Sequence, residues 1–322
     1  MPTSAARIVV IGGANLDIAG RATAPARPGD STPGRVHTAA GGVARNIAEN
    51  LARLGHAVRL VSAVGDDDDG RRLKRLTAAA RVDAGGCRVI AGARTARYLS
   101  LHAEDGRLLQ AVNDMAVLDA LGPDALAAEA GRLRRAAAVV VDANLCEAAL
   151  GWLFDQPIDA ALHADAVSAA KCERLRTGLA RLHTLKLNRL EAEVLSGLPT
   201  RTARQRERAA AWFHAQGVRR LAMSLGADGL RLSEAGGAVC ERPAWPVPVR
   251  NVTGAGDALM AGLVHAQRAG WPLERAADFA LGCAALTVGI DASNHPGLSE
   301  RSVRALQRRR PSIAIAAADN PA

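Results

Sequence analysis

The stretch that decides the fold is Arg250–Gly262, which reads RNVTGAGDALMAG. Before it lies the apolar run 245–249 (WPVPV), whose two prolines predict an edge or irregular strand. After the turn, Leu259, Leu263 and Val264 have the spacing of one buried helix face. A Gly-Ala-Gly turn between strand and helix leaves backbone N–H groups free, and the helix dipole favours an anion there by roughly 0.3–1 kcal/mol. We therefore expect an anion-binding helix start.

An aspartate inside this turn needs a separate explanation, because the carboxylate of Asp257 would repel a bound phosphate. The residue makes sense if a hydroxyl must lose its proton while a phosphoryl group arrives over the glycines. Asp257 would then be the general base, and the free N–H groups would stabilise the charge that develops on the transferred group. The alternative is that Asp257 only caps the helix and the glycines only form a tight turn. An isolated Gly-x-Gly-Asp leaves both interpretations open.

The composition is that of a globular protein without a membrane segment. Its 322 residues (33.4 kDa) are 49% hydrophobic and 23% charged, enough for one large or two modest cores. No run of about 18 apolar residues occurs, and the N-terminus lacks the apolar region of a signal peptide. We expect a soluble, cytoplasmic protein without membrane association. The five cysteines are far apart and never in CxxC spacing, which predicts reduced thiols rather than disulfides or a metal site.

The net charge of +9 raises the question of nucleic-acid binding. Nearly all the basic residues are arginines, since lysine occurs only at positions 74, 171 and 186, and they are spread along the chain among Ala and Gly. Aromatic residues make up only 2%, so the sequence has no basic stripe with interleaved aromatics. We expect no nucleic-acid partner, although the positive field would favour an anionic substrate. The expected partner is a small molecule.

The first strand is predicted at 7–13, where the apolar run RIVVIGG ends in glycines. Asn15 and Asp17 follow directly, at the carboxyl end of a strand, where open α/β sheets place their ligands. Both side chains can hydrogen-bond the hydroxyls of a polyol. The alternative is an Asx turn that closes the strand. Further strands are predicted at 56–65, 136–141, 182–187 and 220–224.

A long helix is predicted after the paired glycines Gly41 and Gly42. Its apolar face consists of Val43, Ile47, Leu51 and Leu54. Gly55 is a good C-terminal cap for this helix. The paired glycines let a substrate approach the helix N-terminus, and Asn46 lies one turn in and points toward that end.

Two segments without a helical period predict a small sheet. Residues 21–38 are rich in Pro, Gly, Thr and Arg, and residues 87–113 alternate in short strands around an Asp105-Gly106 hairpin turn. We expect lid segments at about 19–38 and 88–113 that cover the site and exclude water, which otherwise competes as phosphoryl acceptor. Residues 308–322 are predicted to form a disordered tail.

Two further turns follow predicted strands. Asn188 and Glu191 form an Asn-x-x-Glu pattern at a helix start, where a glutamate by itself most often complements the helix dipole. The stretch from Ser224 through Gly226 to Gly229 is the end of a strand with a glycine-rich turn.

In this order, the motifs resemble those of the ribokinase-like (PfkB) carbohydrate kinase family. The resemblance rests on Gly41-Gly42 with Asn46, on Gly65, Asp66, Asp67 and Gly70, on Asn188-x-x-Glu191, on Ser224 to Gly229, and on Thr253 to Asp257. It covers roughly residues 7–305. It implies an α/β fold, namely a three-layer sandwich with a central, mostly parallel sheet and a small β lid. A single kinase domain would then occupy residues 1–322.

The resemblance also implies a role for each matching residue. The catalytic group would be Asp257, with an anion hole made of Gly254, Ala255 and Gly256. The sugar-binding residues would be Asn15, Asp17, Gly41, Gly42 and Asn46. The nucleotide-binding residues would be Asn188, Ser224, Gly226, Gly229, Thr253 and Asn294. Glu191 would act on the Mg²⁺ of Mg-ATP, usually through water.

One residue departs from the family pattern. Many members have Asp where this chain has Asn251, and that Asp helps to hold a K⁺ ion beside the anion hole. Because Asn is a neutral and weaker ligand, the resemblance implies ATP and Mg²⁺ but leaves K⁺ activation open. Lid strands in the family often pair between subunits, which is consistent with a homodimer through the lid.

Within the family, the chain most resembles the pseudouridine kinase branch. The stretches that carry this resemblance are 43–52, 111–115, 142–145 and 168–171. The resemblance implies ATP-dependent phosphorylation of the 5′-hydroxyl of pseudouridine to give pseudouridine 5′-phosphate, with Asp257 as general base. Two alternatives stay open. One is a kinase for another sugar or nucleoside, such as ribose, adenosine or a fructose phosphate, and the other is a non-catalytic sugar-sensing protein on the same scaffold.

Overall fold

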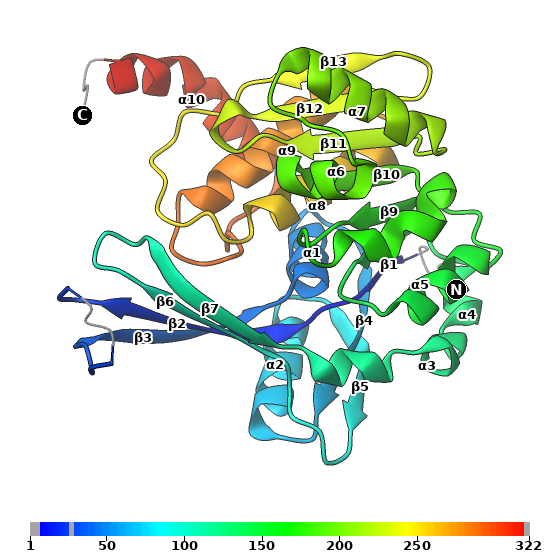
Figure 1. The fold of residues 1–322 in the computed structure, drawn as a ribbon, viewed down its shortest axis with the longest axis vertical. Coiled ribbons are helices and arrows are strands. Elements are labelled where there is room, and N and C mark those ends of the chain that lie inside the picture. The colour runs from blue at the N-terminus through cyan, green and yellow to red at the C-terminus, as the bar shows by residue number, and fades with distance from the viewer. Residues whose placement is uncertain (1–6, 26–28, 319–322) are drawn as a thin grey trace.

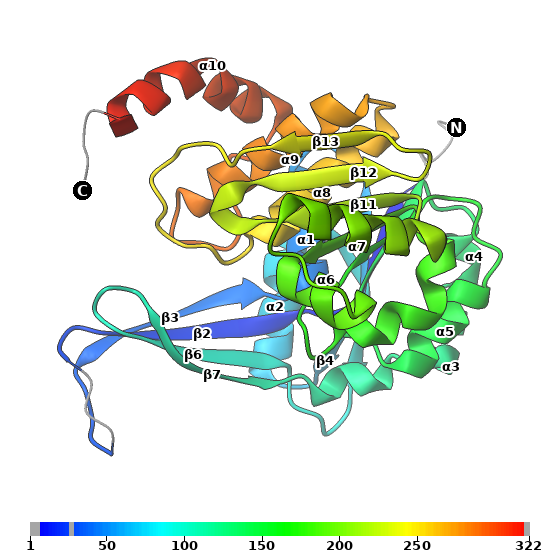
Figure 2. The same ribbon diagram turned by 45° about the horizontal axis from the view of Figure 1, so that its top comes forward.

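The computed structural model describes residues 7–25 and 29–318, and its main body is one large sheet with helices on both faces (Figures 1 and 2). Within these residues the sheet has nine strands in the order β13-β12-β11-β10-β9-β8-β1-β4-β5. The strands from β11 to β5 in this order run parallel, and β12 and β13 are antiparallel at one edge. The bounds are β1 Ile8–Ile11, β4 Val58–Gly65, β5 Asp83–Ile90, β8 Ala138–Asp142, β9 Leu162–Asp165, β10 Thr184–Asn188, β11 Arg220–Ser224, β12 Leu230–Glu234 and β13 Val239–Arg242.

Helices cover both faces because the central strands are apolar on both sides. In β1, Ile8 and Val10 belong to one buried cluster, whereas Val9 and Ile11 belong to another on the opposite face. The first cluster includes residues of α1 Val43–Arg53, α2 Asp68–Ala79, α8 Ala255–Arg268, α9 Leu273–Val288 and the start of α10 Glu300–Ala318. The second includes residues of α3 Pro123–Ala127, α4 Ala130–Leu133, α5 Glu147–Asp155, α6 Arg189–Ser196, α7 Ala203–Ala215 and the 3₁₀ helices Ala116–Ala120 and Cys172–Arg181. The predicted three-layer α/β sandwich is confirmed.

A separate sheet of four strands projects from this body (Figures 1 and 2). Its strands, in spatial order, are β3 Gly34–Gly41, β2 Asn15–Ala22, β6 Arg97–His102 and β7 Leu108–Asp114. The predicted small sheet is therefore present, with two corrections to its limits. Residues 88–90 pair with β4 and belong to the main sheet, and the small sheet begins earlier, at Asn15. Residues 26–28 of the predicted lid lie outside the described part.

Two other segments differ from expectation. Residues 245–249 form no strand, because neither Pro246 nor Pro248 has an N–H group to donate to a sheet. Residues 308–318 continue α10 where a disordered tail is predicted, in line with the good helix formers Arg, Ala and Leu at its start, and residues 319–322 lie outside the described part. In the described ranges, no helix is long and apolar enough to cross a membrane.

Candidate active site

Asp142, at the carboxyl end of β8, joins the turn after β1 to the start of α1. Its Oδ2 accepts the backbone N–H of Gly13 and of Ala44, both at 2.9 Å. A Cβ atom on Gly12 would lie 2.3 Å from Asp142 Oδ1, so the β1 turn needs glycine at this point. Burial raises the pKa of Asp142, although these hydrogen bonds oppose the rise. The sequence gives Asp142 no role, because its partners lie far away in the chain.

The start of α1 holds Asn46 against the start of α8. Gly42 is the N-cap residue of α1 with φ 99°, and a Cβ on it would lie 2.5 Å from the carbonyl oxygen of Gly13. Asn46 lies in the first turn of this helix, where its N–H donates to the Gly42 carbonyl at 2.8 Å. Its side-chain Nδ2 donates to Oδ2 of Asp257 at 2.8 Å. The structure thus brings together the predicted sugar-binding Asn46 and the predicted base Asp257.

Asp257 lies in the first turn of α8 and is buried, with 8% of its surface exposed. Burial is the main reason why its pKa is raised to about 7, and the nearby Asp165 carboxylate adds to the rise. Lys186 and the Asn46 hydrogen bond act in the opposite direction. Within the described chain the side chain of Asp257 accepts a hydrogen bond from Asn46 Nδ2 rather than from a backbone N–H of the α8 start, so Asp257 does not serve as the cap. A buried carboxylate that titrates near neutrality has the property of a general base.

Lys186 is a residue of this site that the sequence does not reveal. It lies near the end of β10, is 8% exposed, and places Nζ 3.1 Å from Oδ2 of Asp165. A Cβ on Gly256 would lie 2.6 Å from this Nζ, so the ammonium group lies directly beside the Gly-Ala-Gly turn. Burial alone lowers the pKa of Lys186, but the carboxylates of Asp165, Glu191 and Asp257 outweigh it and the pKa is raised. Lys186 therefore stays charged beside the predicted anion hole.

The other predicted sugar-binding residues meet where the small sheet joins the main body. Asn15 Nδ2 donates to Oδ1 of Asp17 at 2.7 Å. A Cβ on Gly41 would lie 2.2 Å from Oδ2 of Asp17, so only glycine fits against this carboxylate. Burial raises the pKa of Asp17, while Asn15 and the charge of Arg45 oppose the rise. Asp17 and Asn15 together offer hydrogen-bond acceptors and donors of the kind that bind vicinal hydroxyls.

Another pair of polar residues lies beside the β1 turn. Lys171 Nζ donates to Oδ1 of Asn144 at 2.6 Å. A Cβ on Gly13 would lie 2.6 Å from Nδ2 of Asn144. Burial lowers the pKa of Lys171, although the charge of Asp142 opposes this. The pair brings together the stretches 142–145 and 168–171, which carry part of the family resemblance, at the polar edge of the sheet.

The predicted nucleotide-binding residues lie along the neighbouring strand ends. Asn188 of β10 and Ser224 of β11 are partners in the parallel ladder. Gly229 has φ 103°, and a Cβ on it would lie 2.0 Å from the Arg242 carbonyl oxygen, so the turn after β11 requires glycine there. Thr253 is exposed and its N–H donates to Oδ1 of Asn251 at 2.9 Å. Gly226 opens the same turn as Gly229, with φ 64°.

Glu191 is engaged in capping α6. Its Oε2 accepts the N–H of Asn188 and its Oε1 accepts the Asn188 side-chain amide, both at 2.7 Å. Burial raises the pKa of Glu191, and Lys186 opposes the rise. In the described part of the chain, no three His, Cys, Asp or Glu residues form a group that could hold a metal. The donor set therefore fits a Mg²⁺ ion carried by phosphate oxygens and water, with Glu191 at most an outer partner.

Two asparagines tie the loops around α8 to their neighbours. Asn294 is predicted beside the nucleotide, and its Nδ2 donates to the backbone oxygen of Asn46 in α1 at 3.4 Å. Asn251 accepts the Thr253 N–H through Oδ1 and donates from Nδ2 to the carbonyl of Asp291 at 2.9 Å. Both ends of the Asn251 side chain are thus occupied, and its amide nitrogen faces the carbonyl oxygen. This arrangement does not fit a K⁺ site, which requires oxygen ligands.

Comparison with known proteins identifies the family of this chain. The sequence model of the pfkB family carbohydrate kinases matches residues 5–298. The chain is 40% identical over 303 residues to the pseudouridine kinase of Escherichia coli K12, covering 93% of this chain and 96% of that protein. Its structure resembles Arabidopsis thaliana ribokinase complexed with ribose and ATP, with a TM-score of 0.84, 23% identity, and coverage of 94% and 98% of the two chains. A protein from E. coli provisionally assigned as ribokinase II, solved with ATP and Mg²⁺, gives a TM-score of 0.82 at 19% identity over 94% of this chain and 99% of that chain.

Proposed function

Since the chain belongs to the pfkB family of carbohydrate kinases, phosphotransferases that act on an alcohol group, we propose that it phosphorylates the 5′-hydroxyl of pseudouridine with ATP. The observation that carries the proposal is the contact between Asn46 and Asp257 at the meeting of two helix starts. It places a residue suited to hold a sugar beside one suited to remove a proton. The 40% identity to a pseudouridine kinase favours this acceptor among those used in the family.

In the proposed reaction, the acceptor hydroxyl lies beside Asp257. Its oxygen forms the new bond to the γ-phosphorus of ATP, the bond to the β,γ-bridging oxygen breaks, and ADP leaves with that electron pair. The hydroxyl proton passes to the Asp257 carboxylate, which then releases it to solvent. The products are the 5′-phosphate ester and ADP.

The positive groups at the start of α8 support this transfer. The N–H groups of Gly254, Ala255 and Gly256 lie at a helix N-terminus, where they would donate to the oxygens of the transferring group. The Ala255 N–H donates at 3.3 Å to the Val252 carbonyl and would have to exchange this long hydrogen bond. Lys186 adds a full positive charge beside Gly256. Since Lys186 is held by Asp165, it needs little reorganisation as negative charge moves between ATP and the acceptor.

Substrate positioning falls to residues of the small sheet and of the start of α1. Asp17 and Asn15, with Asn46 and the Gly41-Gly42 backbone, would hold the ribose hydroxyls and so aim the 5′-hydroxyl at Asp257. The small sheet that begins with these residues would act as a lid that excludes water. Its exposed apolar side chains, Val36, Leu99, Leu101, Leu108, Leu109 and Val112, fit a lid that pairs with a second copy.

ATP would bind along the strand ends that carry Asn188, Ser224, Gly226 and Gly229, next to Thr253. Glu191 would orient the hydrated Mg²⁺, which neutralises phosphate charge when bound. For this role its carboxylate would have to exchange part of its capping interaction with Asn188. Asn294 would act indirectly, by supporting α1 through Asn46.

Turnover of ATP with a set of acceptors tests the proposal. The purified protein with Mg-ATP would be assayed on pseudouridine, uridine, ribose, adenosine and fructose 6-phosphate in parallel. Turnover of pseudouridine supports the proposal, and turnover of another acceptor alone would place the protein in a different branch of the family. Binding of ATP without turnover on any acceptor would favour a sugar-sensing protein.

A further inference from the structure

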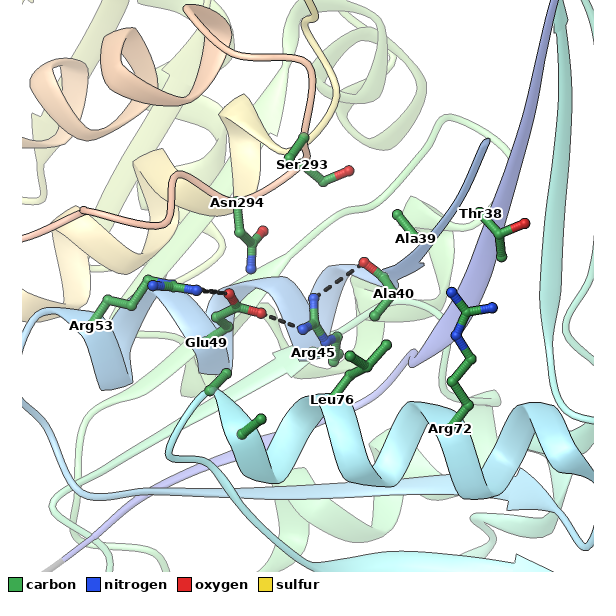
Figure 3. A pocket seen from close by; sticks show the side chains of 13 residues that line it. Thr38, Ala39, Ala40, Arg45, Glu49, Arg53, Arg72, Leu76, Ser293 and Asn294 are labelled. Atoms are coloured by element: carbon green, nitrogen blue, oxygen red, sulfur yellow. Dashed lines mark hydrogen bonds and ion pairs between the residues drawn. The ribbon is translucent and has the colours of Figure 1, made fainter. Parts of the chain in front are cut away.

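A pocket of about 430 Å³ lies between α1, α2, β3 and the loop that contains Ser293 and Asn294 (Figure 3). Its polar lining is made of Arg45, Glu49, Arg53, Arg72 and Asn294, together with the hydroxyls of Thr38 and Ser293. A volume of this size is in the range of small-molecule sites, which run from about 300 to 1,000 Å³. Neither Asp257 nor the Gly-Ala-Gly turn lines it, and Asn294 is the one predicted site residue that it shares, so the pocket lies beside the proposed acceptor and nucleotide sites.

The pocket is positively charged, because three arginines and only one glutamate line it. Glu49 pairs through Oε2 with Arg45, and through Oε1 with Arg53 at 2.5 Å (Figure 3). One carboxylate is thus shared between two guanidinium groups. Arg72 reaches from α2 on the same side of the pocket as Thr38 and forms no ion pair within the described residues. The lining residues therefore carry a net charge of +2, and the carboxylate of Asp17 acts on Arg45 from outside the pocket.

The buried arginine retains an unused donor. Arg45 is 5% exposed, and its Nε has no hydrogen-bond partner in the described part of the structure. A buried donor without a partner costs free energy, and because this Nε is closed to solvent, a ligand oxygen would reach it only if the side chain moved. Guanidinium groups match the oxygens of phosphate with paired hydrogen bonds. An excess charge of two also matches the charge of a phosphate monoester near neutral pH.

The remaining wall of the pocket is apolar. Leu76, Ala79 and Ala80 of α2 face it, as do Ala39 and Ala40 of β3. A free phosphate ion would leave most of this surface and most of the volume unused. We propose that this pocket binds a small organic phosphate ester, with Arg72 and Arg45 around the phosphate and the organic part against the alanine and leucine wall.

Occupancy of the pocket would connect α2 to the lid. The lining residues Thr38–Ala40 belong to β3, which leads directly into Gly41 and Gly42 at the start of α1. Arg45 itself donates to the carbonyl of Ala40 at 3.2 Å. A phosphate held between Arg72 and α1 would therefore hold the base of the small sheet against α2. The ligand would act on the position of the lid rather than on the reacting groups.

Isothermal titration calorimetry at constant ionic strength tests the site, with ribose 5-phosphate, inorganic phosphate and ribose as the three probes. The test variant is Arg72→Glu. The matched control is Arg75→Glu, since Arg75 is exposed on the same helix but does not line the pocket. We expect ribose 5-phosphate to bind the unaltered protein, and Arg72→Glu to weaken it about tenfold or more while Arg75→Glu changes it less than about twofold. Because the side chains of Arg72 and Arg75 are both exposed, neither substitution should change folding, which circular dichroism checks.

Ribose is expected to lack this Arg72-dependent binding, because the phosphate carries the interaction. If inorganic phosphate binds as tightly as ribose 5-phosphate, the pocket is a site for free phosphate, and the proposal of an ester ligand is wrong. No binding of ribose 5-phosphate, unchanged affinity in Arg72→Glu, or an equal loss in both variants would overturn the site, and unchanged affinity would indicate binding at the active site instead. The measurement needs no turnover, so its failure is distinguishable from failure of the proposed kinase activity.

Discussion

The carboxylate of Asp257 accepts a hydrogen bond of 2.8 Å from the side-chain amide of Asn46, which lies 211 positions earlier in the chain. Each residue is in the first turn of its helix, so the contact joins the starts of α1 and α8. The Asn46 donor favours the ionised form of Asp257, against the effect of burial. An acceptor hydroxyl held by Asn46 would therefore lie beside the group that removes its proton.

Asp257→Asn should lower kcat about 10²–10⁴-fold, because it removes the general base with little change of shape. ATP affinity should remain within about threefold, since the nucleotide does not need this carboxylate. Steady-state kinetics and calorimetric titration of ATP measure the two quantities. Near-normal turnover of the variant would remove Asp257 from the reaction.

The pH dependence of kcat/KM should report the raised pKa of Asp257. The base acts only when ionised, so kcat/KM should fall about tenfold per pH unit below a pKa of about 7 and level off above it. Lys186→Met removes a charge that lowers this pKa, so the acid limb should move to higher pH. Asp165→Asn removes a charge that raises the pKa, so the limb should move the other way. Shifts of the same sign in both variants would argue against these electrostatic roles.

Gly254→Ala should destabilise the protein more than Gly270→Ala. Both glycines have left-handed backbones, with φ 82° and 65°, so alanine strains each by about 1–2 kcal/mol. At Gly254 the new Cβ would also lie 1.9 Å from the Ser293 carbonyl oxygen, whereas at Gly270 nothing lies within 4 Å. We expect about 1–3 kcal/mol of additional loss at Gly254 in urea unfolding, together with loss of activity. An equal loss of unfolding free energy in the two variants would mean that the loop with Ser293 moves away from the new Cβ at little cost.

Replacing K⁺ by Na⁺ or choline should change kcat by less than about twofold, because Asn251 offers its amide nitrogen where a cation would need oxygen. Asn251→Asp would put a carboxylate against the Asp291 carbonyl oxygen, and this variant should gain dependence on K⁺. Turnover in the three salts at equal ionic strength measures both effects. Strong K⁺ activation of the unaltered protein would show that this loop binds the ion in another way.

The sequence predicts the local features of this site and misses the contacts between distant segments. The glycine turns before α1 and α8 follow from the sequence, since in each case the glycines directly precede a helical apolar pattern. The pairing of Lys186 with Asp165 cannot be predicted from the sequence, because it depends on β9 and β10 being neighbours in the sheet. Lysine is rare in this chain, and that rarity is the one signal that could have drawn attention to Lys186.

Two features of the structure that the sequence left open have local causes. Glu191, which is predicted to act on Mg²⁺, also forms a capping box with Asn188, an arrangement that the same four-residue spacing favours. Residues 88–90 are predicted in the lid, yet the short apolar run to which they belong extends β5 instead. The sequence of a short apolar run does not determine which of the two sheets the strand joins, because that depends on where its partner β4 lies.

The most direct test of the account is a comparison of pseudouridine with uridine as acceptor, using Mg-ATP and the purified protein, with the product located by phosphorus–proton NMR. The two nucleosides differ only in whether carbon or nitrogen of the uracil ring is joined to the ribose. We predict phosphorylation of pseudouridine at the 5′-hydroxyl, with kcat/KM at least about tenfold above that of uridine, equivalent to about 1.4 kcal/mol of discrimination in the transition state. Equal use of the two nucleosides, or turnover confined to a different sugar, would contradict the proposed function.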